Sequence, residues 1–264
     1  MKIGLIGAGS IGSLLGKAVD QMEDVEKLYI MDRSRQRART LTESITKGVK
    51  IDNLEDLLSK SDLVIEAASQ EAAEEIAPRV LERGKDLMLM SVGALRDENL
   101  RKRIETLAKK NGCKVHIPSG AIAGIDGLKS ASADVIDEVM LITTKPPAAL
   151  EGANLAIDLK SIKEPITLFE GSARDAVRRF PQNINVAATL SLSGIGFDRT
   201  LVKIVVDPDA TRNTHKIIVR GKFGKLSCEV DNVPSPTNPK TSYLAALSAI
   251  TALKNILAPI QIGT

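Results

Sequence analysis

Hydrophobic and polar positions follow one pattern up to about residue 120 and another beyond it. In the first part, short apolar runs alternate with longer charged stretches of helical period, as in repeated strand–helix units. The apolar runs predict strands at Lys2–Ile6, Lys27–Met31, Asp62–Ala67, Asp86–Ser91 and Cys113–Ile117. The stretches between them predict helices at Ile11–Met22, Arg35–Ile45, Asn53–Ser59, Gln70–Arg83 and Glu98–Asn111, the last ended by Gly112. Nearly continuous apolar strands that alternate with helices indicate a doubly wound parallel sheet, covered on both faces.

Beyond residue 120, strand-like runs follow one another with fewer helices between them. The predicted strands are Glu138–Thr144, Ile166–Glu170, Thr200–Val206, His215–Arg220 and Lys225–Val230, the last two joined as a hairpin by a Gly-Lys-Phe-Gly turn. The predicted helices are Arg174–Phe180, Val186–Leu192 and the mostly apolar Thr241–Leu257. We therefore expect an α/β protein with a second, smaller α+β domain on a mixed sheet. The expected divisions are residues 1–120, residues 121–240, and a C-terminal helix at 241–264 that would pack back on the first domain.

Composition and charge exclude several partners. Of the 264 residues, 36 are Lys or Arg and 33 are Asp or Glu, giving a net charge of +3 with both signs interspersed. A nucleic-acid partner is not expected from this distribution. No apolar run reaches the roughly 18 residues of a membrane span, and the first residues lack a signal-peptide pattern. We expect a cytoplasmic protein with two reduced thiols and no membrane partner.

A glycine-rich segment directly follows the first predicted strand and begins the first predicted helix. Gly7-Ala-Gly9-Ser10-Ile11-Gly12 matches G-x-G-x-x-G in the context that this motif requires. The first glycine permits the tight turn, the second lets a pyrophosphate approach the backbone, and the third allows close helix–strand packing. The N-terminus of the helix adds N–H groups and the positive end of a dipole. The segment predicts a Rossmann-type dinucleotide site that uses Gly7, Gly9, Ser10, Ile11 and Gly12.

The residues after the second and third strands bear on which cofactor is bound. Asp32 lies about 20 residues past Gly12, the position of the acid that binds the adenosine ribose in NAD-dependent proteins. Arg33 follows at once, and a guanidinium there suits the 2′-phosphate of NADP. The remaining arginines of this run, Arg35, Arg37 and Arg39, are expected on a solvated helix face. We expect NAD first and NADP as an alternative, with Ala68 leaving room for the nucleotide at the end of the third strand.

Two histidines compete for the one acid/base that a nicotinamide enzyme needs. Imidazole suits proton transfer near neutral pH, and the chain contains only His116 and His215. His116 lies in a predicted buried strand, where it could serve packing alone. His215 begins a strand of the second domain, where it is better placed to meet a substrate, and a surface histidine beside a loop is the alternative for it. Cys113 and His116 point to opposite faces of a strand, so no metal site is predicted. His215 is the expected catalytic residue.

Several segments together resemble the L-aspartate dehydrogenase family over essentially the whole chain. Besides GAGSIG, they are HIPSGAIAG at residues 116–124, FPQNINVAA at 180–188 and NPKTS at 238–242, together with His215 after a turn-rich segment. The resemblance implies His215 as the active-site residue and Ala121 and Asn185 as cofactor contacts. Asn183 is a second candidate for the asparagine, and a helix-capping role is the alternative for Asn185.

The resemblance also implies an activity. It is the reversible oxidation of L-aspartate to iminosuccinate with NAD or NADP, which supplies a precursor of quinolinate for NAD biosynthesis. Two substrate carboxylates require cations, and the candidates in the second half of the chain are Arg199, Lys203, Arg212, Arg220 and Lys240. The partners expected are this small molecule and a second copy of the chain in a homodimer.

Two other enzyme families have the same predicted architecture. A homoserine dehydrogenase or a dihydrodipicolinate reductase also joins a Rossmann domain to a mixed-sheet domain, and fold alone does not separate them. A non-catalytic NAD sensor is a further alternative, although the dispersed charge offers no basic recognition element.

Overall fold

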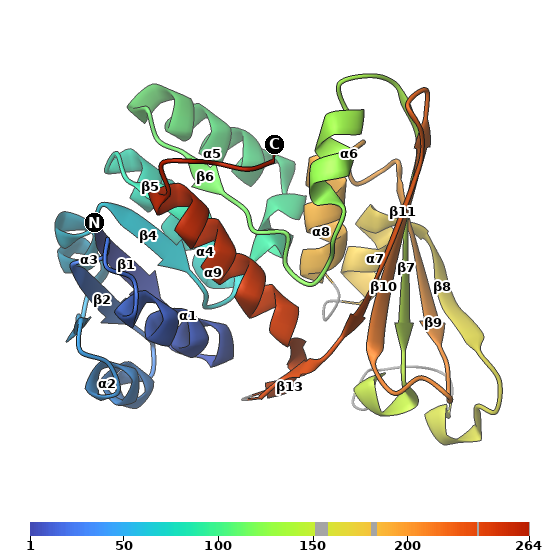
Figure 1. Ribbon diagram of the computed structural model, residues 1–264, viewed down its shortest axis with the longest axis horizontal. Helices are drawn as coiled ribbons and strands as arrows, with labels where there is room; N and C mark the ends of the chain where they lie inside the picture. The colour runs from blue at the N-terminus through green and yellow to red at the C-terminus, as the bar shows by residue number, and fades with distance from the viewer. Residues whose placement is uncertain (151–157, 181–183, 237, 264) are drawn as a thin grey trace. The chain divides into compact units, whose positions relative to one another are not determined.

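The computed structural model describes residues 1–150, 158–180, 184–236 and 238–263, which form two compact units (Figure 1). The first unit contains residues 1–118 and 246–261. The second contains residues 119–245 and the residues that follow 261. The chain therefore leaves the first unit after Pro118 and returns to it within its last helix.

A parallel sheet of six strands forms the centre of the first unit. Its strands are β1 (Lys2–Ile6), β2 (Lys27–Met31), β3 (Gly48–Lys50), β4 (Leu63–Glu66), β5 (Asp86–Leu89) and β6 (Val115–His116). They lie in the order β3-β2-β1-β4-β5-β6, and each neighbouring pair is parallel. This is the Rossmann order, in which the winding reverses between β1 and β4 and leaves a crevice at the carboxyl ends of these strands.

The helices of the first unit begin where their sequences carry capping residues. They are α1 (Ser10–Asp20), α2 (Arg35–Glu43), α3 (Leu54–Lys60), α4 (Gln70–Glu82) and α5 (Glu98–Asn111), with a 3-10 turn, η1, at Val92–Arg96. The side chains of Ser34, Asn53, Ser69 and Asp97 each accept a backbone hydrogen bond as the N-cap. Gly112 ends α5 at a φ of 66°, as predicted. The sequence placed all five helices to within three residues at each end.

The last helix, α9 (Tyr243–Leu257), contributes to the core of the first unit. Its Ala249 and Leu253 are fully buried among Leu15 and Val19 of α1. Figure 1 shows α9, in red, running beside the other helices of this unit. The apolar face of α9 thus joins two chain ends into one domain.

A mixed sheet of five strands forms the second unit. Its strands are β7 (Ile136–Lys145), β8 (Ile166–Ser172), β9 (Thr200–Val206), β10 (Asn213–Gly221) and β11 (Gly224–Asn232). The order is β11-β10-β7-β9-β8; β7 and β9 are parallel and the other pairs antiparallel. The remaining elements are α6 (Ile125–Ala131), η2 (Pro147–Leu150), η3 (Leu159–Ser161), α7 (Ala173–Arg179) and α8 (Ile184–Ser193), followed by β12 (Pro234–Ser235) and β13 (Asn238–Ser242). The mixed sheet and the β10–β11 hairpin confirm the predicted architecture.

Several short elements differ from the sequence prediction. Strand β3 was not predicted, because it has three residues and only Val49 among them is strongly apolar. Helix α6 lies in a small-residue segment that lacks a clear helical period. The last helix was predicted to start at Thr241, but it starts at Tyr243, and residues 238–242 form β13, which pairs with β12. Short elements of this kind depend on neighbouring chain rather than on their own pattern.

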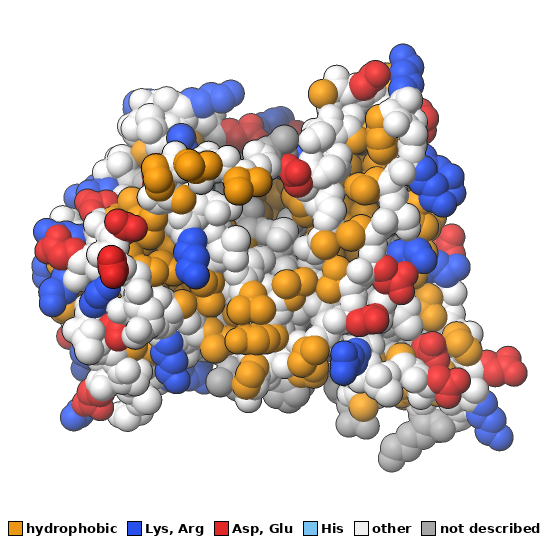
Figure 2. Space-filling model, viewed as in Figure 1, with side chains coloured by type: hydrophobic (Ala, Val, Ile, Leu, Met, Phe, Trp, Pro, Cys, Tyr) orange, Lys and Arg blue, Asp and Glu red, His pale blue; other side chains and the backbone are white. Residues whose placement is uncertain are grey.

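The surface agrees with the interspersed charges of the sequence. On the face drawn in Figure 2, basic and acidic side chains alternate over both units. Within the described residues, no helix has both the length and the apolar character needed to cross a membrane.

Candidate functional site

The glycine loop between β1 and α1 has the geometry of a phosphate cradle. Gly7 adopts a φ of 101°, which strongly favours glycine, and a Cβ on Gly12 would lie 1.9 Å from the carbonyl oxygen of Gly7. A Cβ on Gly9, in contrast, would meet nothing within 4 Å. Gly9 is the N-cap of α1 and caps it with no side chain. The loop therefore presents open space beside a helix N-terminus, which fits a pyrophosphate.

Asp32 fixes the adjoining end of β2. Its Oδ2 accepts a hydrogen bond of 2.6 Å from the Ala8 N–H, and its Oδ1 accepts one of 2.7 Å from the Ser34 N–H. The carboxylate thus joins the glycine loop to the turn before α2. Each oxygen has a further lone pair that can accept a ribose hydroxyl.

A cavity of about 620 Å³ opens at the carboxyl ends of β1, β2 and β4. Of the residues predicted from sequence, Gly7, Gly9, Asp32, Arg33 and Ala68 line it. Ser10, Ile11 and Gly12 form the first turn of the adjacent α1. Other lining residues are Ile6, Met31, Ser34, Arg35, Arg37, Ala38, Lys50, Ile51, Asp52, Ala67, Ser69, Glu71, Ala72 and Ile76.

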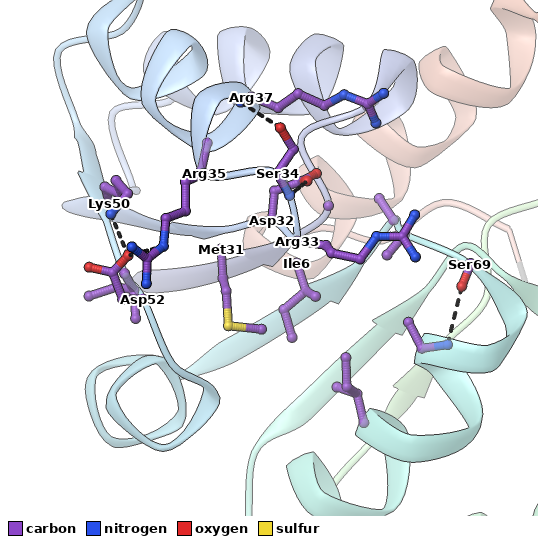
Figure 3. Close-up of a pocket in the computed structure, with 18 of the residues that line it drawn as sticks. Ile6, Met31, Asp32, Arg33, Ser34, Arg35, Arg37, Lys50, Asp52 and Ser69 are labelled. Atoms are coloured by element: carbon purple, nitrogen blue, oxygen red, sulfur yellow. Dashed lines mark hydrogen bonds and ion pairs between the residues drawn. The ribbon is translucent and has the colours of Figure 1, made fainter.

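Cationic side chains line this cavity on more than one side: Arg35 and Lys50 extend toward Asp52, and Arg33 extends the other way, toward Ser69 (Figure 3). Arg33, Arg35 and Arg37 all line the cavity. Arg35 and Arg37 are exposed to solvent on α2, as expected, and this position still borders the cavity. Lys50 forms an ion pair with Asp52, and the Nε of Arg35 lies 4.0 Å from the same carboxylate. The hydrogen bond from Lys50 is the main cause that lowers the pKa of Asp52. The sequence reading missed Lys50 and Asp52 because it missed β3.

A buried carboxylate holds two loops that follow strands of the same sheet. Glu66, the last residue of β4, is fully buried. Its Oε1 accepts hydrogen bonds from the Ala68 N–H at 2.8 Å and the Ser91 hydroxyl at 2.9 Å, and its Oε2 accepts one from the Ser91 N–H at 3.0 Å. Burial raises the pKa of Glu66, while these hydrogen bonds lower it. This network places Ala68 at the rim of the cavity.

In the second unit, His215 lies on the buried face of the mixed sheet. Its side chain is directly opposite Thr143 in the β10–β7 pair, and the Thr143 Oγ1 lies 3.0 Å from its Nδ1. The residue is 6% exposed. Burial, followed by the charge of Lys145, lowers the pKa of His215 to about 4. His215 is thus a neutral imidazole near pH 7, with its Nδ1 in hydrogen-bond contact with the Thr143 hydroxyl.

The second histidine and the two cysteines have different surroundings. His116 is in β6 of the first unit, with Nε2 3.9 Å from Asp86 Oδ2, beyond hydrogen-bond range. Burial lowers the pKa of His116, and the charge of Asp86 partly opposes this. Cys113 and Cys228 are both free thiols, and Cys228 packs close to Gly124.

Residues that the family resemblance singles out also lie in the second unit. Ala121 is buried, and its carbonyl oxygen accepts a hydrogen bond from Asn232 Nδ2 at 3.2 Å. Asn232 Oδ1 in turn accepts a hydrogen bond from the Ser242 hydroxyl. Through this one asparagine, the segment PSGAIAG is joined to the segment NPKTS.

The asparagine candidates of the α8 region are only partly described. Asn185 is the second residue of α8, inside its first turn, so it does not occupy the capping position that the sequence left open. Asn183 lies outside the described residues.

Most of the cations considered for the substrate carboxylates already have protein partners. Arg199 donates to the carbonyl oxygen of Ile136 at 3.1 Å, Lys203 pairs with Glu170 at 3.2 Å, and Arg220 pairs with Glu138 at 3.0 Å. Arg212 is exposed, and the side chain of Lys240 is outside those described. The buried Lys145 was missed, because a single lysine at the end of an apolar run is typical of a strand that reaches the surface.

The fold and the first site define a class of protein before any comparison is made. A parallel sheet in the Rossmann order, with a glycine cradle after β1 and an aspartate after β2 beside a cavity at its switch point, is an NAD(P)-binding domain. Residues 7–118 match the family model "Homoserine dehydrogenase, NAD binding domain", and residues 126–256 match "Aspartate dehydrogenase, C-terminal". The chain is therefore a two-domain nicotinamide-dependent oxidoreductase.

Full-length relatives identify the family within this class. The chain is 53% identical to the L-aspartate dehydrogenase of Methanosarcina barkeri and 51% identical to that of Methanosarcina acetivorans, each over 100% of both chains. The crystal structure of aspartate dehydrogenase from Thermotoga maritima superposes with a TM-score of 0.81 at 31% identity, covering 100% of this chain and 99% of that one. The chain belongs to the L-aspartate dehydrogenase family.

More distant structures share only the fold. A homoserine dehydrogenase from Thiobacillus denitrificans has a TM-score of 0.63 at 14% identity, covering 97% of this chain and 73% of that one. The homoserine dehydrogenase alternative is supported by architecture and by the family model of the first unit, whereas the family model of the second unit and the full-length relatives are those of aspartate dehydrogenase.

Proposed function

We propose that the chain oxidises L-aspartate to iminosuccinate, with NAD or NADP as the hydride acceptor. The observation that carries this proposal is the full-length identity of 53% to an L-aspartate dehydrogenase. Support within the molecule comes from a cradle and cavity that fit a dinucleotide and from a buried neutral histidine in the other unit. A bound nicotinamide would supply the acceptor for the hydride that leaves Cα.

His215 serves in this proposal as the acid/base. Oxidation of an amine to an imine removes a hydride from carbon and a proton from nitrogen, so a neutral base must be at hand. The low pKa of His215 keeps it neutral near pH 7. With Nδ1–H donating to Thr143 Oγ1, the lone pair of Nε2 is available to take the proton from the substrate ammonium. In the reverse direction, the protonated ring returns it to the imine nitrogen.

The cofactor contacts proposed in the first unit follow from its geometry. Gly7, Gly9, Ser10, Ile11 and Gly12 would hold the pyrophosphate, and Asp32 the adenosine ribose. Ala68 would border the nucleotide. Arg33 would accommodate the extra phosphate of NADP, as it lines the cavity beside Asp32. In the second unit, Ala121 and Asn185 would contact the cofactor, as the family resemblance implies.

The product and assembly complete the proposal. Iminosuccinate from this reaction would feed quinolinate synthesis and so NAD biosynthesis in the cytoplasm. The protein would act as a homodimer through the face of the mixed sheet opposite His215. That face carries the partly exposed apolar side chains of Met140, Ile142 and Ile218 and the exposed Leu201. Sedimentation of a monomer at micromolar concentration would contradict the dimer.

A direct assay tests the activity. Purified protein is mixed with NAD or NADP at alkaline pH, which favours release of the proton, and the formation of reduced cofactor is followed. L-Aspartate, L-homoserine and L-alanine are compared as substrates. Turnover of L-aspartate far above the other two is expected, whereas turnover of L-homoserine alone would overturn the proposal.

Binding without turnover is a separate outcome of the same preparation. If NADH binds but none of the amino acids is oxidised, the non-catalytic sensor becomes the better description. NADH fluorescence during titration with the protein distinguishes this outcome from a protein that binds no cofactor.

A further inference from the structure

Two polar groups next to His215 have no role in the mechanism above. Lys145 is the last residue of β7 and is 6% exposed. Among the described residues, no carboxylate lies within 4.0 Å of its ammonium group, the limit that defines the ion pairs of this structure. Asn213, the first residue of β10, has a buried side-chain Oδ1 with no hydrogen-bond partner in the described part of the chain.

Strand register brings these groups to one place. Thr143 is opposite His215 and Thr144 is opposite Thr214, so Lys145 and Asn213 come next along the two strands. Side chains alternate along a strand, which puts Lys145 and Asn213 on the same face as Thr143 and His215. The charge of Lys145 is also one cause of the low pKa of His215. Lysine, asparagine and histidine thus form one polar cluster at the end of an otherwise apolar sheet face.

Packing alone does not explain this cluster, because Lys145 lacks a carboxylate partner and Asn213 Oδ1 lacks a hydrogen-bond partner among the described residues. Burial of an ammonium group without an anion is costly, and burial lowers the pKa of Lys145 accordingly. Asp207, which follows β9, does not pair with it; the Asp207 carboxylate accepts a hydrogen bond from the Asp209 N–H. An unpaired acceptor beside an unpaired cation matches a ligand that carries both a carboxylate and an ammonium group.

We propose that Lys145 binds a carboxylate of the substrate next to His215, while Asn213 Oδ1 accepts a hydrogen bond from the substrate ammonium group. This inference rests on the proposed function for the identity of the substrate. Lys145 then supplies charge recognition that Lys203 and Arg220 do not, because those two side chains are bound to Glu170 and Glu138. The ammonium group is held where Nε2 of His215 can take its proton.

The test replaces Lys145 by methionine, which keeps an unbranched chain and removes the charge. The matched control is Lys216→Met, next to His215 on the same strand but paired with Glu229. The KM for L-aspartate should rise about 10²-fold in Lys145→Met, because a charged pair is lost in a buried site. The control should change it little, and NADH affinity should stay the same in both variants. Lys145→Arg, which keeps the charge, should recover part of the loss.

A binding measurement separates this inference from the activity. Succinate is a dicarboxylate without an amino group, so calorimetry can follow its binding to the wild-type protein without turnover. Wild type and Lys216→Met should bind it, and Lys145→Met should not. If wild type binds succinate but never oxidises L-aspartate, the proposed function fails and the Lys145 site stands.

Stability provides the check on folding. Removal of an unpaired buried charge should leave the melting temperature of the free protein unchanged or raise it. Unaltered succinate binding and an unaltered KM in a folded Lys145→Met protein would overturn the inference. The same holds for an equal loss of succinate binding in Lys145→Met and Lys216→Met. If Lys145→Met does not fold, Lys145→Gln takes its place under the same criteria.

Discussion

The two candidate sites of this molecule are built in opposite ways. The dinucleotide site of the first unit consists largely of backbone, on one short loop, with glycines that leave space for a ligand. The polar cluster of the second unit consists of side chains from β7 and β10, about seventy residues apart, on a buried sheet face. In the first site the carboxylates of Asp32 and Glu66 are hydrogen-bonded to the protein, whereas in the second the buried ammonium group of Lys145 has no carboxylate within 4.0 Å among the described residues. The proposed roles match this difference, since the backbone site would hold the cofactor and the buried side chains would select the substrate.

The largest effect that distinguishes the two sites is expected from removal of the His215 side chain. His215→Ala should lower kcat by about 10²-fold or more, as expected for removal of an acid/base. NADH binding should change little, because the glycine loop and Asp32, which are proposed to hold the pyrophosphate and the ribose, lie in the other unit. His116→Ala is the control, and steady-state kinetics with fluorescence titration measure both. A large loss of kcat in the control with little in His215→Ala would reverse the assignment.

Low pH should lower the free energy of unfolding of the protein, because the same histidine becomes protonated in the unfolded chain. His215 has a pKa of about 4 in the folded protein, whereas a histidine in an unfolded chain has one near 6.5. Between these values the unfolded state binds more protons, so the stability is fully present above about pH 6.5 and is lost as the pH falls toward 4. The loss for this group should be about 2 kcal/mol between pH 7.5 and pH 5.

Urea unfolding at the two pH values, followed by circular dichroism, measures this dependence. Comparison with His215→Gln isolates the contribution of His215, because His116 also has a lowered pKa and is present in both proteins. An equal pH dependence in the two proteins would refute the prediction.

Two glycines of the backbone site should respond differently to the same methyl group. Gly12→Ala places Cβ against the Gly7 carbonyl, so the loop must move at a cost of about 1–3 kcal/mol, and NADH affinity should also fall. Gly9→Ala meets no protein atom within 4 Å, so the stability should hold. Its methyl group would still occupy space meant for the pyrophosphate and should weaken NADH binding about tenfold. Thermal melts and NADH titration of both variants test whether the cofactor occupies the open space at Gly9.

The smallest expected effect concerns the choice of cofactor. Arg33→Ala should raise the KM for NADP about tenfold and leave that for NAD unchanged, because Arg33 is exposed and its contact with a phosphate is partly screened by solvent. Arg39→Ala is the control, since Arg39 pairs with Glu43 at 2.7 Å. Equal changes for both cofactors would assign Arg33 a general electrostatic role.

The sequence by itself determined the elements of the first unit and its cofactor loop. Periodic apolar runs, capping residues such as Ser69 and Asp97, and a contiguous glycine motif are local features, so they can be interpreted without knowledge of distant chain. The sequence also singled out His215 from the two histidines of the chain, because it begins a strand of the second domain and because the family resemblance implies it. Strand β3, with Lys50 and Asp52, was missed because three residues carry too little pattern.

Only the tertiary structure determined which side chains surround His215. The register of β10 against β7 sets Thr143 on its Nδ1 and brings Lys145 and Asn213 to the same face. None of these neighbours is marked in the sequence, since a threonine, a lysine and an asparagine at strand ends are ordinary residues. Their chemistry arises from burial and pairing between distant strands, which raise the cost of an unpaired charge and shift the pKa of the histidine. The sequence identified His215 as a candidate, and the pairing of β7 with β10 determined which groups surround it and lower its pKa.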